Sequence, residues 1–364
     1  MDKPYPQQLS EKEQRLQILL GETVAYFPTV RSKEHGFRNK AKMMVLGTVD
    51  HPILGIVNHH QQAIDLSNCP LYPASFFALF EAIKRFIKMA RLTPYQIQKR
   101  KGELKYVLLH YSEHENAFAL RFVLRSSHHI ERIQQHLDSL LTEFSSIKIV
   151  SVNIQPVPMA IFEGDEEVVL VSNANQHHAS VLEERLNGIP FYIRPQGFFQ
   201  TNTDIAKELY ITAQRWVSEL APDHVVDLFC GAGGFGLHCL NDKASLIGYD
   251  ISAESVASAQ ASAEQLGVAD RCQFFAQNLL AQLPKLIQLP DVLLVNPPRR
   301  GLGENVTRWV ASQSPRCVVY SSCNAETMAK DIQELRDYRV TRAQIFDMFP
   351  HTEHFETLAL LLRN

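Results

Sequence analysis

The stretch HVVDLFCGAGGFGLHCLN, residues 224–241, decides the fold. Its first seven residues are mostly apolar, as in a buried strand, and its last seven have the pattern of a helix. Between them lie Gly231, Gly233 and Gly236 in the spacing G-x-G-x-x-G. Glycines at these positions let the backbone turn tightly and approach a ligand closely. The stretch therefore predicts the first strand, ligand loop and helix of a doubly wound α/β domain.

The rest of the chain continues this alternation. We expect helices at 252–267, 305–314 and 325–335. Short apolar runs between helices indicate buried strands of a parallel sheet. With the strand at 224–230 these runs make seven: 244–250, 272–277, 290–296, 316–321, 338–349 and 356–363. No helix separates the last two, which predicts an antiparallel pair at one edge of a Rossmann-like, seven-stranded sheet.

The N-terminal half has a different character. A helical stretch at 73–92 is followed by strand-like runs at 104–112, 116–125 and 146–156, which predicts an antiparallel α+β domain. The polar segment 172–188 is rich in Asn, Ser and His and is typical of a boundary. We therefore expect domains at 1–180 and 181–364.

Composition restricts the class of protein. The chain has 364 residues, 45% hydrophobic and 21% charged, with a formal charge of −3, so only local patches could bind nucleic acid. Its six cysteines form no CxxC pair, which argues against a disulfide framework or a zinc site. The N-terminus is polar, and no apolar run is long enough for a membrane span. We expect a reduced cytoplasmic protein without membrane contact.

The acidic residue after the glycine loop indicates a nucleoside ligand. Asp250 ends the second strand, 19 residues after Gly231, where a carboxylate can accept hydrogen bonds from both hydroxyls of a ribose. This pattern fits NAD and S-adenosylmethionine equally well, so an oxidoreductase is a rival hypothesis.

Asn296 separates the two hypotheses. It ends a predicted strand and precedes two prolines, which fix the backbone in an extended conformation. We expect the carbonyl groups that follow to point outward and grip a planar base or an amino group. Asn-Pro-Pro in this fold is characteristic of methyltransferases that act on nucleobases. Arg299 and Arg300 suit phosphate contacts, although a solvated pair of charges is an equal alternative.

Cys323 lies between a predicted strand and a predicted helix. A lone cysteine is more often simply buried, but carbon 5 of uracil becomes nucleophilic once a thiolate adds to carbon 6. A helix N-terminus there would lower the thiol pKa. The reaction also needs a base to remove the carbon-5 proton. We favour Glu356, at the start of the last strand, over Glu353 in the preceding loop.

These motifs together resemble the RNA 5-methyluridine methyltransferases. Five of them occur in the order of that family: RPQGFFQTN (194–202), DLFCGAGGFGLH (227–238), NPPRRGLG (296–303), YSSCNAETMAKDI (320–332) and FPHTEHFETLALL (349–361). The resemblance implies that Cys323 is the nucleophile and Glu356 the base. It also implies that S-adenosylmethionine contacts Gln200, Phe229, Asp250 and Asn296, beside the Gly231 loop.

Motifs of the N-terminal half resemble the members that methylate 23S ribosomal RNA. They are GFRNKAKM (36–43), CPLYPASF (69–76) and RKGELKY (100–106). The resemblance implies C5-methylation of a 23S rRNA uridine, in a loop or single strand, through a cysteine–C6 adduct. Another rRNA site, a tRNA, cytosine-5 methylation and a non-catalytic RNA-binding factor are the alternatives. We expect a monomer that does not bind DNA.

Most members of the family also carry a [4Fe-4S] cluster on four cysteines. Cys69 matches the last ligand, but no other cysteine precedes Cys230, and one thiolate cannot hold a cluster. Either the first residues are lost or the protein lacks the cluster, so we predict no metal site.

Two basic stretches of the first domain are the expected RNA contacts. Residues 31–42 hold five basic residues against one acidic residue, and residues 84–105 hold eight against one. Solvated helix faces are the alternative, above all for Lys84 and Lys88. The target base must leave its stack, and Phe198 or Phe199 could line its pocket.

Overall fold

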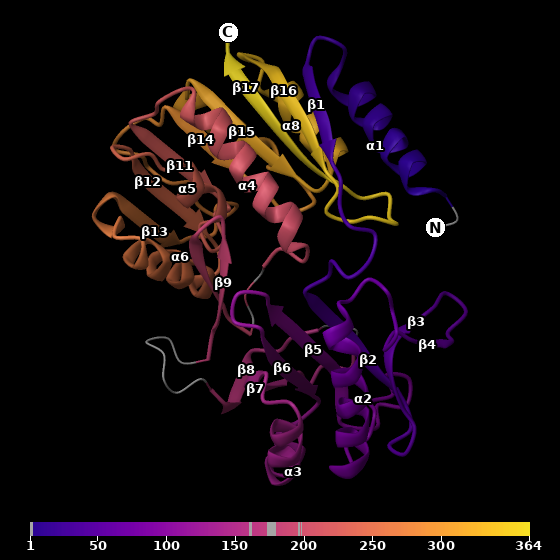
Figure 1. Cartoon of the computed structure of the whole chain (residues 1–364). Helices are drawn as coiled ribbons and strands as arrows, with labels where there is room; N and C mark the ends of the chain where they lie inside the picture. The colour runs from indigo at the N-terminus through magenta and orange to yellow at the C-terminus, as the bar shows by residue number, and fades with distance from the viewer. Residues whose placement is uncertain (1–2, 160–161, 173–179, 196, 198) are drawn as a thin grey trace. The chain divides into compact units, whose positions relative to one another are not determined.

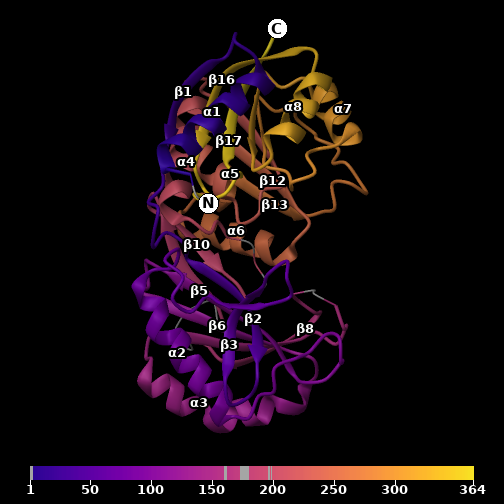
Figure 2. The same ribbon diagram turned by 90° about the vertical axis from the view of Figure 1, so that its right-hand side faces the viewer.

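The computed structural model describes residues 3–159, 162–172, 180–195, 197 and 199–364 (Figures 1 and 2). The chain divides into two compact units. The first comprises residues 1–34, 185–192 and 197–364, and the second comprises residues 35–184 and 193–196. The hairpin of β9 (Leu182–Leu186) and β10 (Ile189–Ile193) spans the points where the chain passes from one unit to the other.

An eight-stranded sheet forms the centre of the first unit, in the order β1-β16-β17-β15-β14-β11-β12-β13. Neighbouring strands from β13 to β15 are parallel, whereas β17 runs antiparallel to both β15 and β16. The strands are β1 (Ala25–Val30), β11 (His224–Leu228), β12 (Ser245–Asp250), β13 (Cys272–Ala276), β14 (Val292–Val295), β15 (Cys317–Ser322), β16 (Tyr338–Phe346) and β17 (Glu356–Arg363). The doubly wound α/β fold predicted from the sequence is thereby confirmed.

The edge of this sheet differs from the prediction. All seven expected strands form, but β17 lies inside the sheet between β15 and β16, and β1 pairs in parallel with β16 at the outer edge. Pro28 lies within β1 and has no N–H to donate, which suits an edge strand with one unpaired side. Because β1 contains this proline and is half-exposed, a search for apolar runs does not find it.

Helices cover both faces of the sheet. The helices α1 (Tyr5–Leu20), α7 (Glu304–Gln313) and α8 (Ala325–Glu334) bury Leu16, Val306 and Met328 against one face, in a single apolar cluster. The helix α4 (Thr203–Ser218) contacts β16, β17 and α5 (Gly234–Cys239), and α6 (Ala253–Gln265) contacts β12 and β13. Side chains alternate along a strand, and those on both faces of the central strands are buried and mostly apolar.

The second unit holds a seven-stranded sheet in the order β4-β3-β2-β5-β6-β7-β8. The helices α2 (Ala74–Met89) and α3 (Ile130–Glu143) pack their apolar sides against it, with Phe80, Phe86 and Leu137 in the core. The strands are β2 (Lys40–Gly47), β3 (Pro52–Val57), β4 (Ala63–Asp65), β5 (Leu104–Ser112), β6 (Ala117–Leu124), β7 (Ile147–Ile154) and β8 (Glu166–Val171). The sheet is antiparallel except for β6 and β7, which run parallel because α3 connects them.

The second unit begins later in the chain than the N-terminal domain that we expected. We expected residues 1–180 to form the first domain, but residues 1–34 belong to the same unit as the C-terminal half. The reason is that α1 buries Leu16 in the core of that unit and β1 joins its sheet. The chain returns to the first unit after Glu184, close to the boundary that we expected after residue 180.

Candidate active site

The glycine loop connects β11 to α5. Phe229 and Gly231 adopt positive φ angles of 61° and 55°. Beyond its two chain neighbours, no described residue has an atom within 4 Å of the position that a Cβ atom would occupy on Gly231, so this backbone is open to a ligand. Asp227, at the end of β11, accepts a 2.8 Å hydrogen bond from the N–H of Gly236 and holds the loop against the helix. The loop therefore has the exposed, tightly turned backbone that a nucleoside ligand needs.

Asp250 lies beside this loop at the end of β12. Its carboxylate accepts 2.9 Å hydrogen bonds from the N–H groups of Gly231 and Ser252. An open cavity of about 250 Å³ lies at the ends of β12 and β13. In its wall the rings of Tyr249 and Phe275 stack with their centroids 5.4 Å apart. An aromatic wall suits a planar base, and Asp250 directly follows Tyr249 in the chain.

Asn296 follows β14 and is half-buried, with Pro297 buried behind it. Its N–H donates to the carbonyl of Leu228, which ties this strand end to the glycine loop. Two of the carbonyl groups that we expected to be free have hydrogen-bond partners within the protein. The carbonyl of Pro298 accepts from the N–H of Gly301, and that of Arg299 accepts a 3.0 Å bond from the side chain of Asn324. The Pro-Pro segment thus braces the loop that carries Cys323.

Cys323 lies between β15 and α8 and is half-buried. The side chain of Asn324 caps α8 by accepting from the N–H groups of Glu326 and Thr327. Arg299 hydrogen-bonds the sulfur of Cys323. A cavity of about 130 Å³ opens at this thiol and is lined by Arg15, Arg299, Cys323, Asn324, Ala325, Glu326, Glu353, His354 and Phe355. The thiol is therefore accessible from a small cavity lined by both cationic and anionic side chains.

The electrostatics at Cys323 differ from the prediction. We expected the start of α8 to lower the thiol pKa, but burial and the negative charge of Glu356 raise it. Arg299 opposes this rise without cancelling it. A desolvated thiol beside a carboxylate stays protonated more readily, so a helix N-terminus alone does not decide the charge.

Glu356 is the first residue of β17 and is 3% exposed. Burial raises the pKa of its carboxyl group to about 7, and a hydrogen bond from Ser321 limits that rise. A carboxyl group with a pKa near neutrality can accept and release a proton under physiological conditions. Glu353, which we ranked below Glu356, is exposed in the preceding loop.

Gln200 brings a third segment to this site. It is buried, two residues before Asn202, which caps α4 by accepting from the N–H of Ile205. Gln200 hydrogen-bonds Tyr210, and burial together with the charge of Glu356 raises the pKa of that phenol. Reasoning from residue types missed both side chains and predicted only the start of a helix, capped by Asn202 or Thr203. The family motif at 194–202 was the one signal that singled out Gln200.

The structure brings the site residues to one end of the parallel strands. Phe229, Asp250, Asn296 and Cys323 lie at or after the ends of β11, β12, β14 and β15, which are neighbours in the sheet. Glu356 begins β17, which runs antiparallel and so starts at the same end. Ligands of open α/β sheets bind at this end of the strands.

Cys69 does not fit a metal centre. It is half-buried and packs against the apolar core of the second unit, whereas Cys230, Cys239, Cys272, Cys317 and Cys323 lie in the first unit. Among the described residues there is no group of three or more His, Cys, Asp or Glu side chains placed to hold a metal ion. One thiolate supplies a quarter of the ligands that a [4Fe-4S] cluster requires.

Five of the thirteen cations of the two basic stretches form ion pairs with acidic side chains. The pairs are Lys33–Asp204, Lys42–Glu163, Lys84–Asp65, Lys84–Glu81, Arg85–Glu143 and Arg91–Asp50. Lys105 is buried. By contrast, Lys99, Arg100 and Lys101 are exposed in the segment between α2 and β5. Of the two aromatic candidates, Phe199 is buried near Phe191, and Phe198 lies outside the described residues.

The fold, the glycine loop with Asp250, and Asn296 define the class of the protein as a nucleoside-cofactor-dependent methyltransferase. Residues 285–364 match the family model of tRNA (Uracil-5-)-methyltransferase, and residues 188–316 match that of the Methyltransferase small domain. Over its whole length the chain is 49% identical to the 23S rRNA (uracil(747)-C(5))-methyltransferase RlmC of Xenorhabdus nematophila, covering 95% of that protein. The RlmC of Shewanella oneidensis is 47% identical over 99% of the chain, with 94% of that protein covered. The chain therefore belongs to the RlmC family of S-adenosylmethionine-dependent RNA (uracil-C5)-methyltransferases.

A solved structure agrees with this assignment. The tRNA (uracil-54, C5)-methyltransferase of Pyrococcus abyssi, in complex with S-adenosyl-L-homocysteine, matches with a TM-score of 0.79 at 26% identity. The match covers 99% of this chain and 84% of that one. The open backbone at Gly231 and the carboxylate of Asp250 fit such a nucleoside ligand. No helix in the described part of the chain is long and apolar enough to cross a membrane.

Proposed function

We propose that this protein methylates carbon 5 of a uridine in 23S ribosomal RNA through a covalent bond between Cys323 and carbon 6 of the base. The single observation that supports this most is the pairing at one strand end of an accessible thiol with a buried carboxyl group. Burial and Glu356 raise the pKa of the thiol, and burial raises that of Glu356 to about 7. This chemistry requires a nucleophile and a base, and here the charge of the base, Glu356, acts on the nucleophile, Cys323.

The sulfur of Cys323 begins the reaction as a thiolate that bonds to carbon 6. The electrons of the 5,6 double bond then move into the ring carbonyl as an enolate, which makes carbon 5 nucleophilic. Arg299 stabilises the thiolate through its charge and its hydrogen bond. S-adenosylmethionine, held by Gln200, Phe229, Gly231, Asp250 and Asn296, would supply the methyl group that carbon 5 takes up and would leave as the neutral thioether.

Glu356 completes the reaction. Its carboxylate takes the remaining proton from carbon 5, and the electron pair of that C–H bond restores the 5,6 double bond. The bond between sulfur and carbon 6 breaks, and Cys323 leaves as a thiolate. The hydrogen bond from Ser321 keeps the carboxylate form of Glu356 accessible near neutral pH. Glu356 is thus the base and Cys323 both the nucleophile and the leaving group.

The choice of 23S rRNA rests on the curated relatives, which share 46–49% identity with the chain and are named for that substrate. The tRNA enzyme of Pyrococcus abyssi is more distant, at 26% identity. We propose that the second unit, residues 35–184, recognises the RNA and that Lys99, Arg100 and Lys101 contact its phosphates. An enzyme with this substrate works in the cytoplasm, and we propose that it acts as a monomer.

A trapping experiment tests the mechanism. RNA that carries 5-fluorouridine at the target should form a stable covalent complex in the presence of S-adenosylmethionine, because fluorine cannot leave carbon 5 as the proton does. We expect a shifted band on a denaturing gel with the wild-type protein and none with Cys323→Ala. Cys272→Ala, at a half-buried cysteine on β13, is the matched control and should trap RNA normally. An adduct that persists in Cys323→Ala excludes this residue as the nucleophile.

The substrate needs a separate measurement. Methyl transfer to a 23S rRNA fragment that contains the target loop should be at least tenfold faster than transfer to unmodified tRNA at equal concentrations. Equal or faster transfer to tRNA would exclude the 23S assignment and leave the cysteine mechanism intact.

A further inference from the structure

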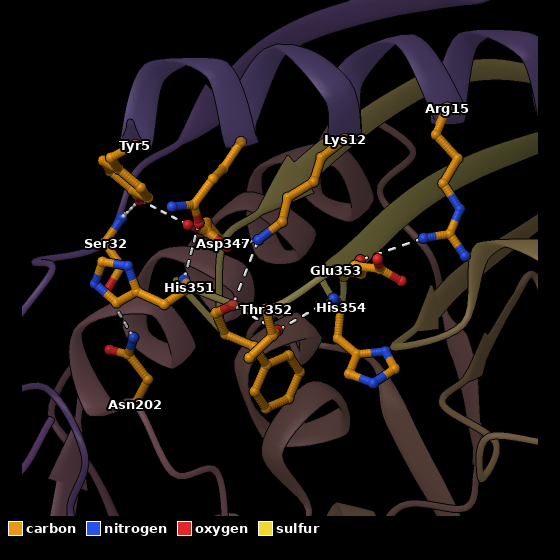
Figure 3. Close-up of polar contacts among 12 residues, drawn as sticks. Tyr5, Lys12, Arg15, Ser32, Asn202, Asp347, His351, Thr352, Glu353 and His354 are labelled. Carbon is orange, nitrogen blue, oxygen red and sulfur yellow. Dashed lines mark hydrogen bonds and ion pairs between the residues drawn. The ribbon is translucent and has the colours of Figure 1, made fainter. Parts of the chain in front are cut away.

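The N-terminal helix α1 lies along the segment that leads to Glu356 (Figure 3). The ammonium group of Lys12 lies 2.7 Å from Oδ1 of Asp347, and the two side chains are 4% and 0% exposed. The hydroxyl of Tyr5 donates a 2.7 Å hydrogen bond to the other carboxylate oxygen. Both oxygens of Asp347, nine residues before Glu356, are therefore held by side chains of α1.

Further contacts of α1 follow the same segment toward β17. The side-chain oxygen of Gln8 accepts a 3.0 Å hydrogen bond from the N–H of His351, a residue with a positive φ of 65°. Arg15 donates a 3.2 Å hydrogen bond to the carbonyl of Glu353 and forms an ion pair with Glu326 in the first turn of α8. The helix thus contacts both the segment before Glu356 and the helix that begins after Cys323.

A second path connects α1 to the segment of Gln200. The hydroxyl of Tyr5 accepts a 2.9 Å hydrogen bond from the N–H of Ser32. The hydroxyl of Ser32 accepts a 2.8 Å bond from the side chain of Asn202, which caps α4 two residues after Gln200 (Figure 3). One hydrogen-bonded network therefore reaches the segments that carry the base and Gln200.

The segment 347–355 has little regular structure of its own, since β16 ends at Phe346 and β17 begins at Glu356. A loop with a positive φ at His351 needs contacts from outside to keep one conformation. An ion pair that is excluded from water is stiffer and less screened by salt than a surface pair. We propose that α1 is a positioning element of the active site, in which Lys12 and Arg15 hold Glu356 in place to take the carbon-5 proton.

This inference rests on the proposed function and predicts which step fails without the helix contacts. Formation of the bond between Cys323 and carbon 6, and methylation of carbon 5, do not need the carboxylate of Glu356. Removal of the carbon-5 proton does, and only then does the bond to sulfur break. Loss of the α1 contacts should therefore leave methylated RNA attached to Cys323.

The experiment compares two rates in the full-length protein. The first is adduct formation with 5-fluorouridine RNA, and the second is release of methylated RNA that carries ordinary uridine. We expect Lys12→Met to slow release at least tenfold while adduct formation stays within threefold of wild type, so that the covalent complex accumulates. Lys12→Arg, which keeps the charge, should recover most of the release rate. Arg15→Met, at an exposed side chain, should slow release by a smaller factor, about two- to fivefold.

Controls separate positioning from loss of the fold. Lys3→Met removes another lysine near the start of α1, whose ion pair with Glu11 is solvent-exposed, and should change neither rate. Lys12→Met leaves the charge of Asp347 buried without its partner, so Lys12→Met with Asp347→Asn is the better-folded variant. Slow release with normal adduct formation in that double variant supports the inference.

Two outcomes overturn different statements. Wild-type release in both the double variant and Arg15→Met, or an equal decrease of both rates, excludes a positioning role for α1. Absence of an adduct in the wild-type protein excludes the proposed cysteine mechanism instead.

Discussion

The hydroxyl of Ser321 on β15 donates a 2.5 Å hydrogen bond to Oε1 of Glu356 on β17. The two strands are antiparallel neighbours, so the bond crosses from the strand that leads to the nucleophile to the one that begins with the base. Burial raises the pKa of Glu356 to about 7, and the Ser321 bond lowers it because it favours the charged carboxylate. Ser321 therefore lowers the pH at which the buried Glu356 becomes a base.

The first expectation concerns the pH dependence of product release. The rate should rise with pH through about 7, as Glu356 loses its proton. Ser321→Ala removes a hydrogen bond to a charged group, worth about 1.5–3 kcal/mol, and should move this rise about one to two pH units upward. Single-turnover release measured between about pH 5.5 and 9 checks this. Ser312→Ala, at an exposed serine on α7, is the control, and an unmoved profile in Ser321→Ala would contradict the assignment.

A second expectation is that the catalytic carboxylate destabilises the fold at high pH. The pKa of Glu356 is raised in the folded state, so the folded protein binds the proton more tightly than the unfolded chain. The resulting stabilisation is present below the ordinary value of 4.5 and is lost as pH rises through about 7. Glu356→Gln has no charge to bury, so at pH 8 it should be more stable than wild type by up to about 3 kcal/mol.

Urea unfolding at pH 5 and pH 8 measures this effect. The stabilisation by Glu356→Gln should be small at pH 5 and large at pH 8, while release of methylated RNA is lost at both. Glu353→Gln changes an exposed glutamate three residues away and should leave the free energy of unfolding unchanged. A gain from Glu356→Gln that is equal at both pH values would exclude a buried charge as its cause.

A third expectation concerns Asp250 and the cofactor. Its carboxylate accepts hydrogen bonds from the N–H groups of Gly231 and Ser252 and so lies against the glycine loop. Asp250→Ala should weaken binding of S-adenosylmethionine about 10- to 100-fold, since hydrogen bonds to a charged group contribute about 1.5–3 kcal/mol. Calorimetric titration without RNA gives the affinity. Asp242→Ala, in the exposed loop before β12, is the control, and equal affinity in Asp250→Ala would remove this residue from the cofactor site.

Local sequence patterns predicted the doubly wound sheet because its strands are buried on both faces and read as continuous apolar runs. The parts that the patterns missed depend on pairing between distant segments. The strand β1 is half-exposed and interrupted by Pro28, and only its pairing with β16 makes it a strand. The parallel pairing of β6 and β7 follows from the path of α3 between them, which apolar alternation does not reveal.

In the site, too, local patterns predicted some features, and contacts between distant segments determine the rest. The ends of β11, β12, β14 and β15 placed Asp250, Asn296 and Cys323 near one another, because parallel strands end at one side of a sheet. The direction of the pKa shift at Cys323 could not be predicted, since it depends on burial and on Glu356, 33 residues away in sequence. The contacts between α1 and Asp347 join residues more than 300 positions apart, and neither end carries a recognisable motif.

The last expectation concerns RNA binding by the second unit. Lys99, Arg100 and Lys101 are exposed, whereas Lys84, Arg85 and Arg91 of the same basic stretch have acidic partners. Alanine at all three exposed positions should weaken binding of the 23S rRNA fragment and reduce the slope of log K against log salt by about 2, since each single-strand phosphate contact contributes about 0.7. The rate at saturating RNA should stay the same, because these residues lie outside the unit that holds Cys323. Filter binding between about 50 and 300 mM salt measures the slope.

Alanine at Lys84, Arg85 and Arg91 removes the same charge and is the matched control, since these cations already have partners. A control triple that lowers the slope as much would show that the paired cations bind RNA equally and would exclude residues 99–101 as the particular contact.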